Sequence, residues 1–391
     1  MIRTAMIDPV GLFILAFLSR IYQLLIVAPP TSQQINGTAS MLGILLGMTA
    51  CYLFILPLYC LLRRHRGVGL VDCGYLLAGK AGGSIYTALL GLFSLLMLVK
   101  TVSGFTIFIN ETVYQESSGI MILLLFLAMV IFAVHLGIEP ISRISVFIVA
   151  LLIAALAVLS FSLVSQFEMG NLYSPLYDGW KPVLHSAFVT LSNNIEILAI
   201  AVLVPYVKGD CTWSFHRYVW LVLVGLEFIV FVATAAMGDY ASTQRYPFFS
   251  MTRTAGFSLF QVLDSVYMVV WILTAFVRGA LWLFVGKYCL GKLVRQPVRK
   301  RMPVICGIVS GTAALVISAK GEYFERLSAI WYVAIPMAIL GFLIPLILLL
   351  LSFLRKRREN PVLDTQVVDS GEEDGEGQSQ IEAEGEVKND G

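Results

Sequence analysis

The sequence predicts an all-α polytopic membrane protein with about ten transmembrane helices. Of its 391 residues, 58% are hydrophobic and only 13% are charged, and the mean hydropathy is +0.83. Runs such as Met121–Gly137, Val146–Val164 and Ile335–Leu354 contain no Asp, Glu, Lys or Arg over the length that a helix needs to cross ~30 Å of hydrocarbon. Because such a chain has too little polar surface to cover a soluble domain, most of it must lie in a membrane.

The individual spans follow from these apolar runs and from the turn and charge signals between them. In chain order, the expected spans are 9–29, 38–62, 83–109, 119–137, 140–165, 182–207, 213–238, 257–288, 303–319 and 328–354. Arg3 and Asp8 precede the first span, and no small-residue cleavage site follows it. We therefore expect this segment to stay in the mature chain as a real span.

Basic residues are distributed unequally between the two sides of the expected bundle. With a cytoplasmic N-terminus, 18 Lys and Arg residues fall in inner segments and 5 in outer loops. Because short loops rich in Lys and Arg stay on the inner side, both termini are expected to be cytoplasmic. The inner cluster Lys287–Arg301 is expected to contact anionic membrane lipids rather than nucleic acid.

The composition divides the chain into two regions. Residues 1–354 are expected to form a transmembrane domain whose repeats cover about 9–165 and 182–354, and 355–391 to form a basic cap and a cytoplasmic tail. From Asp364 onward the tail holds ten acidic residues, one Lys and no aromatic residue, a composition typical of disorder. The tail is expected either to stay solvated or to fold back onto the basic inner loops.

Charged residues in apolar surroundings are the strongest indication of function. Each costs at least ~2.5 kcal/mol at mid-membrane unless it is paired or faces water. The charged residues within or near spans are Arg20, Lys100, Glu111, Glu196, Glu227, Asp264 and Arg278. We expect them to face the bundle interior, with surface placement as the alternative for Arg20, Glu111 and Asp264.

Two spans carry signs of a broken helix. Span one passes through Ser19–Gln23, and span six is interrupted by Thr190–Asn194 just before Glu196. Ser and Asn compete for backbone hydrogen bonds, and unwound backbone at membrane depth is tolerated only beside protein or a water-filled cavity. Corresponding broken helices in two halves are typical of inverted-repeat transporters with a midplane binding site. The alternative is that these polar side chains only join neighbouring helices.

Other patterns indicate neither catalysis nor metal binding. The sequence contains no Gly-rich phosphate loop, nucleophile–base constellation or CxxC pair, so we expect neither an enzyme nor a cofactor. Its six cysteines and four histidines have no metal-ligand spacing, so no metal site is expected. Gly43 and Gly47 in span two are interpreted as a site of close helix packing.

One short motif suggests a family. Gly137-Ile138-Glu139-Pro140-Ile141-Ser142-Arg143 resembles the Gly-x-Glu-x-x-x-Arg signature between spans four and five of the spore germination permeases, the B subunits of endospore germinant receptors. The other matching residues are Asn171–Pro175 and Pro182 around the loop before span six, the span-six acid Glu196, and Asp264 and Arg278 in span eight. The resemblance covers about residues 8–354.

The resemblance implies both a fold and a function. The family belongs to the amino acid–polyamine–organocation superfamily, whose fold is a five-plus-five inverted repeat with helices 1 and 6 broken. By resemblance, the chain is a permease-like subunit in the inner membrane of a dormant bacterial spore, where it senses a small nutrient such as an amino acid. It would act beside germinant receptor A and C subunits.

One departure from the family affects the expected ligand. Tyr22 and Leu24 stand where the family commonly has small residues in the unwound part of span one. Bulkier side chains reshape the pocket, so Arg20 and Lys100 become candidates to bind an anionic group in place of exposed backbone amides.

The candidate residues form two sets. The candidate ligand-binding residues are Tyr22, Gln23, Leu24, Lys100, Ser192, Asn193, Asn194, Glu196 and Arg278. The residues expected to be structural are Gly137, Glu139, Arg143, Pro182 and Asp264. For Glu196, ligand binding and pairing with Lys100 or Arg278 stay open as alternatives.

Two other functions also fit the sequence. An ion-coupled secondary transporter of amino acids or related solutes would use the same cavity for alternating access. A scaffold that only holds partner proteins in the membrane would not depend on the cavity.

Overall fold

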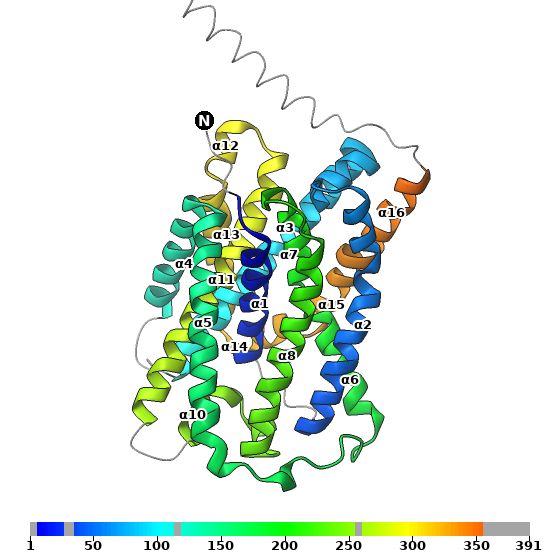
Figure 1. Ribbon diagram of the computed structural model, residues 1–391. Coiled ribbons are helices and arrows are strands. Elements are labelled where there is room, and N and C mark those ends of the chain that lie inside the picture. The colour runs from blue at the N-terminus through cyan, green and yellow to red at the C-terminus, as the bar shows by residue number, and fades with distance from the viewer. Residues whose placement is uncertain (1–5, 27–34, 113–118, 255–259, 355–391) are drawn as a thin grey trace, which may run out of the picture. The chain divides into compact units, whose positions relative to one another are not determined.

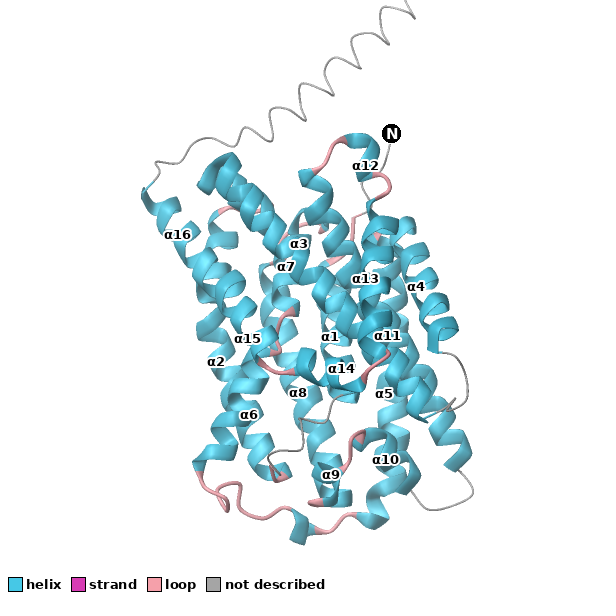
Figure 2. Cartoon of the chain, turned by 180° about the vertical axis from the view of Figure 1, so that it is seen from behind, coloured by secondary structure: helices cyan, strands magenta, loops and turns pink. Residues whose placement is uncertain are grey.

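The computed structural model describes residues 6–26, 35–112, 119–254 and 260–354. In these ranges the chain is helical apart from connecting loops and an isolated backbone bridge between Ile7 and Val207, as Figures 1 and 2 show. The all-α membrane fold predicted from the sequence is confirmed. The acidic tail and the end of span one at Pro29 lie outside the described residues.

The first half of the chain supplies helices that overlap the first five predicted spans. They are α1 (Pro9–Ile26), α2 (Gly37–Arg64), α3 (Leu70–Thr112), α4 (Gly119–Leu136) and α5 (Ile138–Leu163). By length and composition α2 to α5 can each cross a membrane, whereas α1 is a shorter apolar helix.

The second half supplies helices that overlap the remaining predicted spans. They are α6 (Trp180–Ser192) with α7 (Glu196–Leu203), α8 (Thr212–Met237), α11 (Phe260–Leu293), α13 (Met302–Ser318), and α15 (Trp331–Met337) continued by the π-helix η4 (Ala338–Leu343) and by α16 (Ile344–Leu354). The short connecting helices are η1 (Val164–Gln166), η2 (Met169–Asn171), η3 (Val204–Tyr206), α9 (Tyr240–Thr243), α10 (Pro247–Thr254), α12 (Gln296–Arg299) and α14 (Gly321–Ser328).

The peripheral helices present large apolar side chains outward. Phe147 and Phe161 of α5 are 70% and 84% exposed, and Phe132 of α4 is 64% exposed. In water such a surface would promote aggregation, whereas lipid tails solvate it. These helices therefore form the lipid-facing wall of the bundle.

α1 and α11 are among the helices in the interior of the bundle. α1 contacts α5, α7, α8 and α11, and α11 also packs along α3 (Figure 1). Gly91 of α3 permits this close approach, because a Cβ atom there would lie 2.5 Å from the Leu290 side chain of α11. Polar residues on α1 and α11 are consequently held away from lipid.

The predicted interruption of span six is confirmed. Residues 193–195 separate α6 from α7 and are not helical. The side-chain amides of Asn193 and Asn194 donate to the carbonyl oxygens of Val189 and Thr190, at 3.0 and 2.8 Å. Carbonyls at a helix end need such partners, so the two asparagines both favour the break and stabilise it.

The predicted interruption of span one at Ser19–Gln23 is wrong, because α1 is continuous through this stretch. Its polar side chains bond to other helices. The Ser19 hydroxyl donates to the Glu196 carboxylate at 3.0 Å, and the Tyr22 hydroxyl donates to the Thr101 carbonyl at 3.1 Å. Since these hydrogen bonds are tertiary, they do not compete with the backbone bonds of α1, and the helix continues.

The interpretation of Gly43 and Gly47 as packing residues is confirmed. A Cβ atom on Gly43 would lie 2.4 Å from the Ser186 Cβ, and one on Gly47 would lie 2.5 Å from the Ala187 carbonyl oxygen. Both neighbours belong to α6. The two glycines therefore let the backbones of α2 and α6 approach closely, as small residues do between membrane helices.

We expect Gly47→Ala to destabilise the protein by about 1–3 kcal/mol, because the added methyl group meets backbone that cannot move aside. The thermal unfolding temperature of the purified protein in detergent measures this loss. Gly321→Ala is the matched control, since nothing lies within 4 Å of a Cβ atom there. Equal stability of the two variants would contradict this account of the α2–α6 contact.

Candidate functional site

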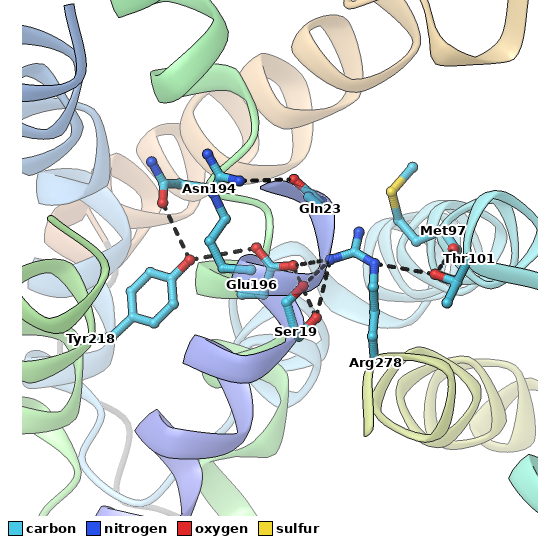
Figure 3. A network of polar contacts seen from close by, with 9 residues as sticks. Ser19, Gln23, Met97, Thr101, Asn194, Glu196, Tyr218 and Arg278 are labelled. Atoms are coloured by element: carbon cyan, nitrogen blue, oxygen red, sulfur yellow. Dashed lines mark hydrogen bonds and ion pairs between the residues drawn. The ribbon is translucent and has the colours of Figure 1, made fainter. Parts of the chain in front are cut away.

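A buried carboxylate lies at the start of α7, directly after the break in span six. Glu196 is 0% exposed. It accepts hydrogen bonds from Arg278 Nη1 at 2.6 Å, from the Ser19 hydroxyl at 3.0 Å and from the Tyr218 hydroxyl at 3.4 Å, as Figure 3 shows. Glu196 thus connects α7 with α1, α8 and α11. Of the two pairing partners considered from the sequence, Arg278 is the one that it meets.

Arg278 extends the same network to α3. Its Nε donates to the Thr101 hydroxyl at 3.1 Å, and its Nη1 also donates to the Ser19 backbone carbonyl (Figure 3). The guanidinium carbon lies 5.9 Å from the centre of the Tyr22 ring, within the range of a cation–π contact. One side chain therefore bonds to α1, α3 and α7 from its own helix α11.

The Glu196–Arg278 pair is shielded from water, since their side chains are 0% and 3% exposed. Removing two charges from water is costly, and their mutual attraction compensates only when further hydrogen bonds satisfy both groups. Here Ser19, Thr101 and Tyr218 provide those bonds. The pair therefore holds the helix break and the neighbouring helices in one arrangement.

A cavity of about 330 Å³ lies beside this network. It follows α8 from Leu226 to Gly238 at the end of that helix and also borders α1, α2, α3, α6 and α11. It thus reaches from the middle of the bundle to one end. Near the other end Lys292 of α11 forms an ion pair with Asp72 of α3, and the Tyr288 hydroxyl donates to the same carboxylate at 3.3 Å.

The predicted site residues divide between the cavity and the wall behind it. The predicted residues that line the cavity are Tyr22, Gln23, Leu24, Lys100, Asn193 and Arg278. Ser192, Asn194 and Glu196 are buried and do not line it. Asn194 instead accepts a hydrogen bond from the Tyr218 hydroxyl at 3.2 Å, so it belongs to the supporting network.

The residues of the family motif lie at the junction of α4 and α5, away from the cavity. Gly137 has φ +105°, a conformation that side chains with a Cβ rarely adopt. Glu139 and Arg143, one helical turn apart on α5, form an exposed ion pair, which contributes little stability. Gly137 therefore shapes the turn that lets α5 follow α4 directly.

The other residues expected to be structural are placed less fully. Pro182 lies in the first turn of α6, where its missing amide hydrogen costs no helical bond. Asp264 lies in α11, but its side chain is outside the described residues.

The remaining charged positions lie elsewhere. Glu111, at the end of α3, accepts hydrogen bonds from Arg245 at 2.9 Å and from the Tyr246 hydroxyl at 2.6 Å. Burial and the Glu111 carboxylate raise the pKa of Tyr246 above its ordinary value. Glu227 of α8 is half-buried and does not line the cavity.

Sequence reasoning missed three members of the network: Ser19, Thr101 and Tyr218. Ser19 was noted for a possible helix break and not as a hydrogen-bond donor to the Glu196 carboxylate. Each of the three is a hydroxyl inside an apolar helix, a type of residue that usually bonds within its own helix or faces a neighbour. Thr101 is adjacent to Lys100, and Ser19 to Arg20. Proximity to an intramembrane charge was the available signal, whereas nothing local marks Tyr218.

Solved transporter structures share this fold. A nucleobase-cation-symport-1 family transporter with bromovinylhydantoin bound has a TM-score of 0.61 at 14% identity, over 84% of this chain and 76% of that one. MhsT in complex with L-phenylalanine has a TM-score of 0.56 at 15% identity, over 88% and 98%. A manganese transporter from Eremococcus coleocola has a TM-score of 0.55 at 13% identity, over 94% and 91%.

We expect Glu196→Gln to destabilise the protein by about 3–5 kcal/mol, because it leaves Arg278 as an uncompensated buried charge. The double variant with Arg278→Gln should recover part of this loss, because both charges are then gone. Thermal unfolding in detergent measures Glu196→Gln, Arg278→Gln and the double variant, with Glu322→Gln on the exposed face of α14 as the control. Strictly additive losses would show that the two residues are not coupled.

Comparison of the sequence itself with known proteins identifies the family. A search of the curated proteins gives no match. The family model described as spore germination protein matches residues 6–322, which include the motif at Gly137, the helix break and the Glu196–Arg278 pair. This confirms the resemblance seen in the sequence: the chain belongs to the spore germination protein family.

Proposed function

We propose that this chain is the membrane subunit of a spore germinant receptor, which binds a small nutrient in the cavity and thereby triggers germination. The observation that carries the proposal is the cavity of about 330 Å³, which lies beside the broken span six in a chain of the spore germination protein family. Pockets of this kind, mostly apolar with a few fixed polar groups, are typical of small-molecule sites.

The cavity chemistry favours an organic solute over a metal ion. Its lining includes the cationic side chains of Arg20, Lys100 and Arg278, which repel a metal cation. Two transporters of similar fold were solved with small organic molecules bound, one with bromovinylhydantoin and the other with L-phenylalanine. An amino acid or a similar nutrient is therefore the ligand that we propose.

In this proposal the predicted residues have two roles. Tyr22, Gln23, Leu24, Lys100 and Asn193 contact the nutrient. Arg278 borders the cavity and, with Ser192, Asn194 and Glu196, holds the break in place. The nutrient binds one of two conformations of the helix bundle more tightly than the other. The change in the equilibrium between these conformations cannot exceed the difference in the nutrient's affinity for them.

The proposal includes the setting of the subunit. The chain lies in the spore inner membrane. Both of its termini are cytoplasmic, an orientation that the excess of Lys and Arg on one side favours. In this proposal residues 1–354 form the permease-like domain, and 355–391 supply a basic cap followed by the acidic tail. Germinant receptor A and C subunits relay the signal. The chain itself binds the nutrient and does not act as an enzyme.

The similarity to solved transporters favours a second function, ion-coupled uptake of the same solute. The two functions share the cavity and differ in whether the solute crosses the membrane. Uptake of a labelled nutrient by the purified protein in liposomes distinguishes them. Sustained accumulation driven by an H⁺ or Na⁺ gradient would support the transporter, and its absence with saturable binding would support the sensor.

Filling the cavity should strongly weaken the response to the nutrient. Val189 of α6 lines the cavity, so we expect Val189→Phe to weaken the response by about tenfold or more, because the ring occupies space that the nutrient needs. The fall in optical density of a spore suspension after nutrient addition measures the response. Leu184→Phe is the matched control, since Leu184 lies on the same helix and is 59% exposed.

Both variants should accumulate in the membrane to the level of the parent protein, which immunoblotting checks. A normal response of the Val189→Phe spores at that level would rule out the cavity as the nutrient site. A lost response in the Leu184→Phe spores as well would indicate that α6 acts through its outward face.

A further inference from the structure

The polar end of the cavity carries more positive than negative charge. Arg20, Lys100 and Arg278 line it, and no Asp or Glu of the described residues does so. Glu196 lies behind Arg278 as its ion-pair partner and attracts Arg20 from a longer distance, so one negative charge faces three positive ones. Two positive charges therefore remain near the middle of the bundle, where an unbalanced charge is costly.

Arg20 has hydrogen-bonding capacity that the protein leaves unused. Its side chain is 5% exposed, and its Nη1 donates a hydrogen bond to the Gln23 side-chain oxygen at 3.3 Å. Its Nε is buried and has no partner in the described part of the chain.

Gln23 cannot neutralise the positive charge of Arg20, because its side chain is uncharged. If its amide is turned over, the oxygen accepts instead from Arg278 Nη2 and Nη1, at 2.5 and 3.0 Å. One neutral amide thus lies between two guanidiniums and gives its oxygen to one of them at a time. In either orientation Arg20 has no carboxylate partner of its own among the described residues, because Glu196, the anion that attracts it, is ion-paired with Arg278.

Lys100 is the second cation without a carboxylate partner of its own among the described residues. It lies on α3 beside Thr101, which is bonded to Arg278, and it lines the cavity. Among the described residues its ammonium group has no hydrogen bond or ion pair. A lysine with long apolar flanks on both sides cannot reach the membrane surface, so its charge must be met inside the cavity.

The backbone amides of α1 cannot bind the anionic group of a ligand, so side chains must do so. Because α1 is continuous through residues 19–23, its amide groups there bond within the helix and cannot receive a ligand. The walls further along the cavity are mostly apolar, with Leu24, Val189, Leu226 and Phe248 beside neutral polar residues such as Ser186 and Thr234. A suitable ligand therefore has an anionic end and an apolar body.

We infer that the cavity binds small apolar carboxylates, whose carboxylate group accepts hydrogen bonds from Arg20 and Lys100. This inference rests on the proposed function and names its ligand class. An arginine fork matches the two oxygens of a carboxylate, and the lysine adds a charge-assisted bond. The class includes amino acids with apolar side chains and simple carboxylic acids of the same shape.

Three probes that share an isobutyl group test the inference on the purified full chain in detergent. L-leucine carries a carboxylate and an ammonium group, 4-methylpentanoate only the carboxylate, and 3-methylbutan-1-amine only the ammonium group. Calorimetric titration near neutral pH should detect binding of leucine, of 4-methylpentanoate or of both, and no binding of the amine. Binding of 4-methylpentanoate as tight as that of leucine would show that the ammonium group contributes nothing.

Variants assign the charges to residues. Arg20→Gln and Lys100→Gln should each weaken binding of the better carboxylate by about tenfold or more, because each removes a charge-assisted hydrogen bond. Lys80→Gln should bind like the parent protein, because Lys80 is exposed on the same helix as Lys100 and outside the cavity.

Stability of the unliganded protein gives a second readout. Lys100→Met should raise the unfolding temperature by about 2 °C or more, because it removes an uncompensated charge. A purely structural lysine would give a lower unfolding temperature when replaced. This measurement needs no ligand, so it tests the charge argument by itself.

The inference would be overturned by an amine that binds as tightly as leucine, by unchanged affinity in both Gln variants, or by no binding of either carboxylate to the parent protein. Its failure differs from failure of the proposed function. If Val189→Phe spores lose their response while the Gln variants keep theirs, the cavity senses a nutrient of another class. If Val189→Phe spores respond normally, the cavity is not the sensing site.

Discussion

The buried ion pair between Glu196 and Arg278 is the interaction on which the rest of the structure depends. In an apolar bundle, each of these charges is tolerated only while the other stays within hydrogen-bonding distance. Glu196 begins the helix after the break, and Arg278 belongs to the helix that packs against α1 and α3. Keeping the pair together therefore fixes the break, the position of α1 and the inner end of the cavity at once.

Much of the fold could be predicted from local patterns. The apolar runs placed the spans, and the consecutive Asn193 and Asn194 marked the break in span six, because their side chains act on the backbone beside them. The continuity of α1 could not be predicted in this way. Ser19 and Tyr22 bond to Glu196 and Thr101, partners that are far away in sequence and are known only once the helices are packed.

The candidate site was predictable to the same extent. Intramembrane charge alone singled out Lys100, Glu196 and Arg278, and the structure brings all of them to one region. Which of the two cations pairs with Glu196 depends on how α3 and α11 are rotated about their axes, and no local pattern encodes that rotation. The same rotation leaves Lys100 facing the cavity.

The family motif and the cavity lie in different parts of the molecule. The motif that marks the family includes Gly137, which shapes the α4–α5 junction, whereas the cavity is lined by residues such as Tyr22, Leu24 and Lys100. A scaffold can therefore be kept while the side chains around its cavity change.

The central claim is that a nutrient occupies the cavity beside the ion pair. Ser40 lines this cavity from α2, and Ser40→Cys changes its volume little. The most direct measurement is the rate at which a water-soluble thiol reagent labels this variant, relative to the parent protein, with and without a nutrient that triggers the response. We predict that the nutrient slows labelling at concentrations that trigger germination; an unchanged rate at saturating nutrient would contradict the account.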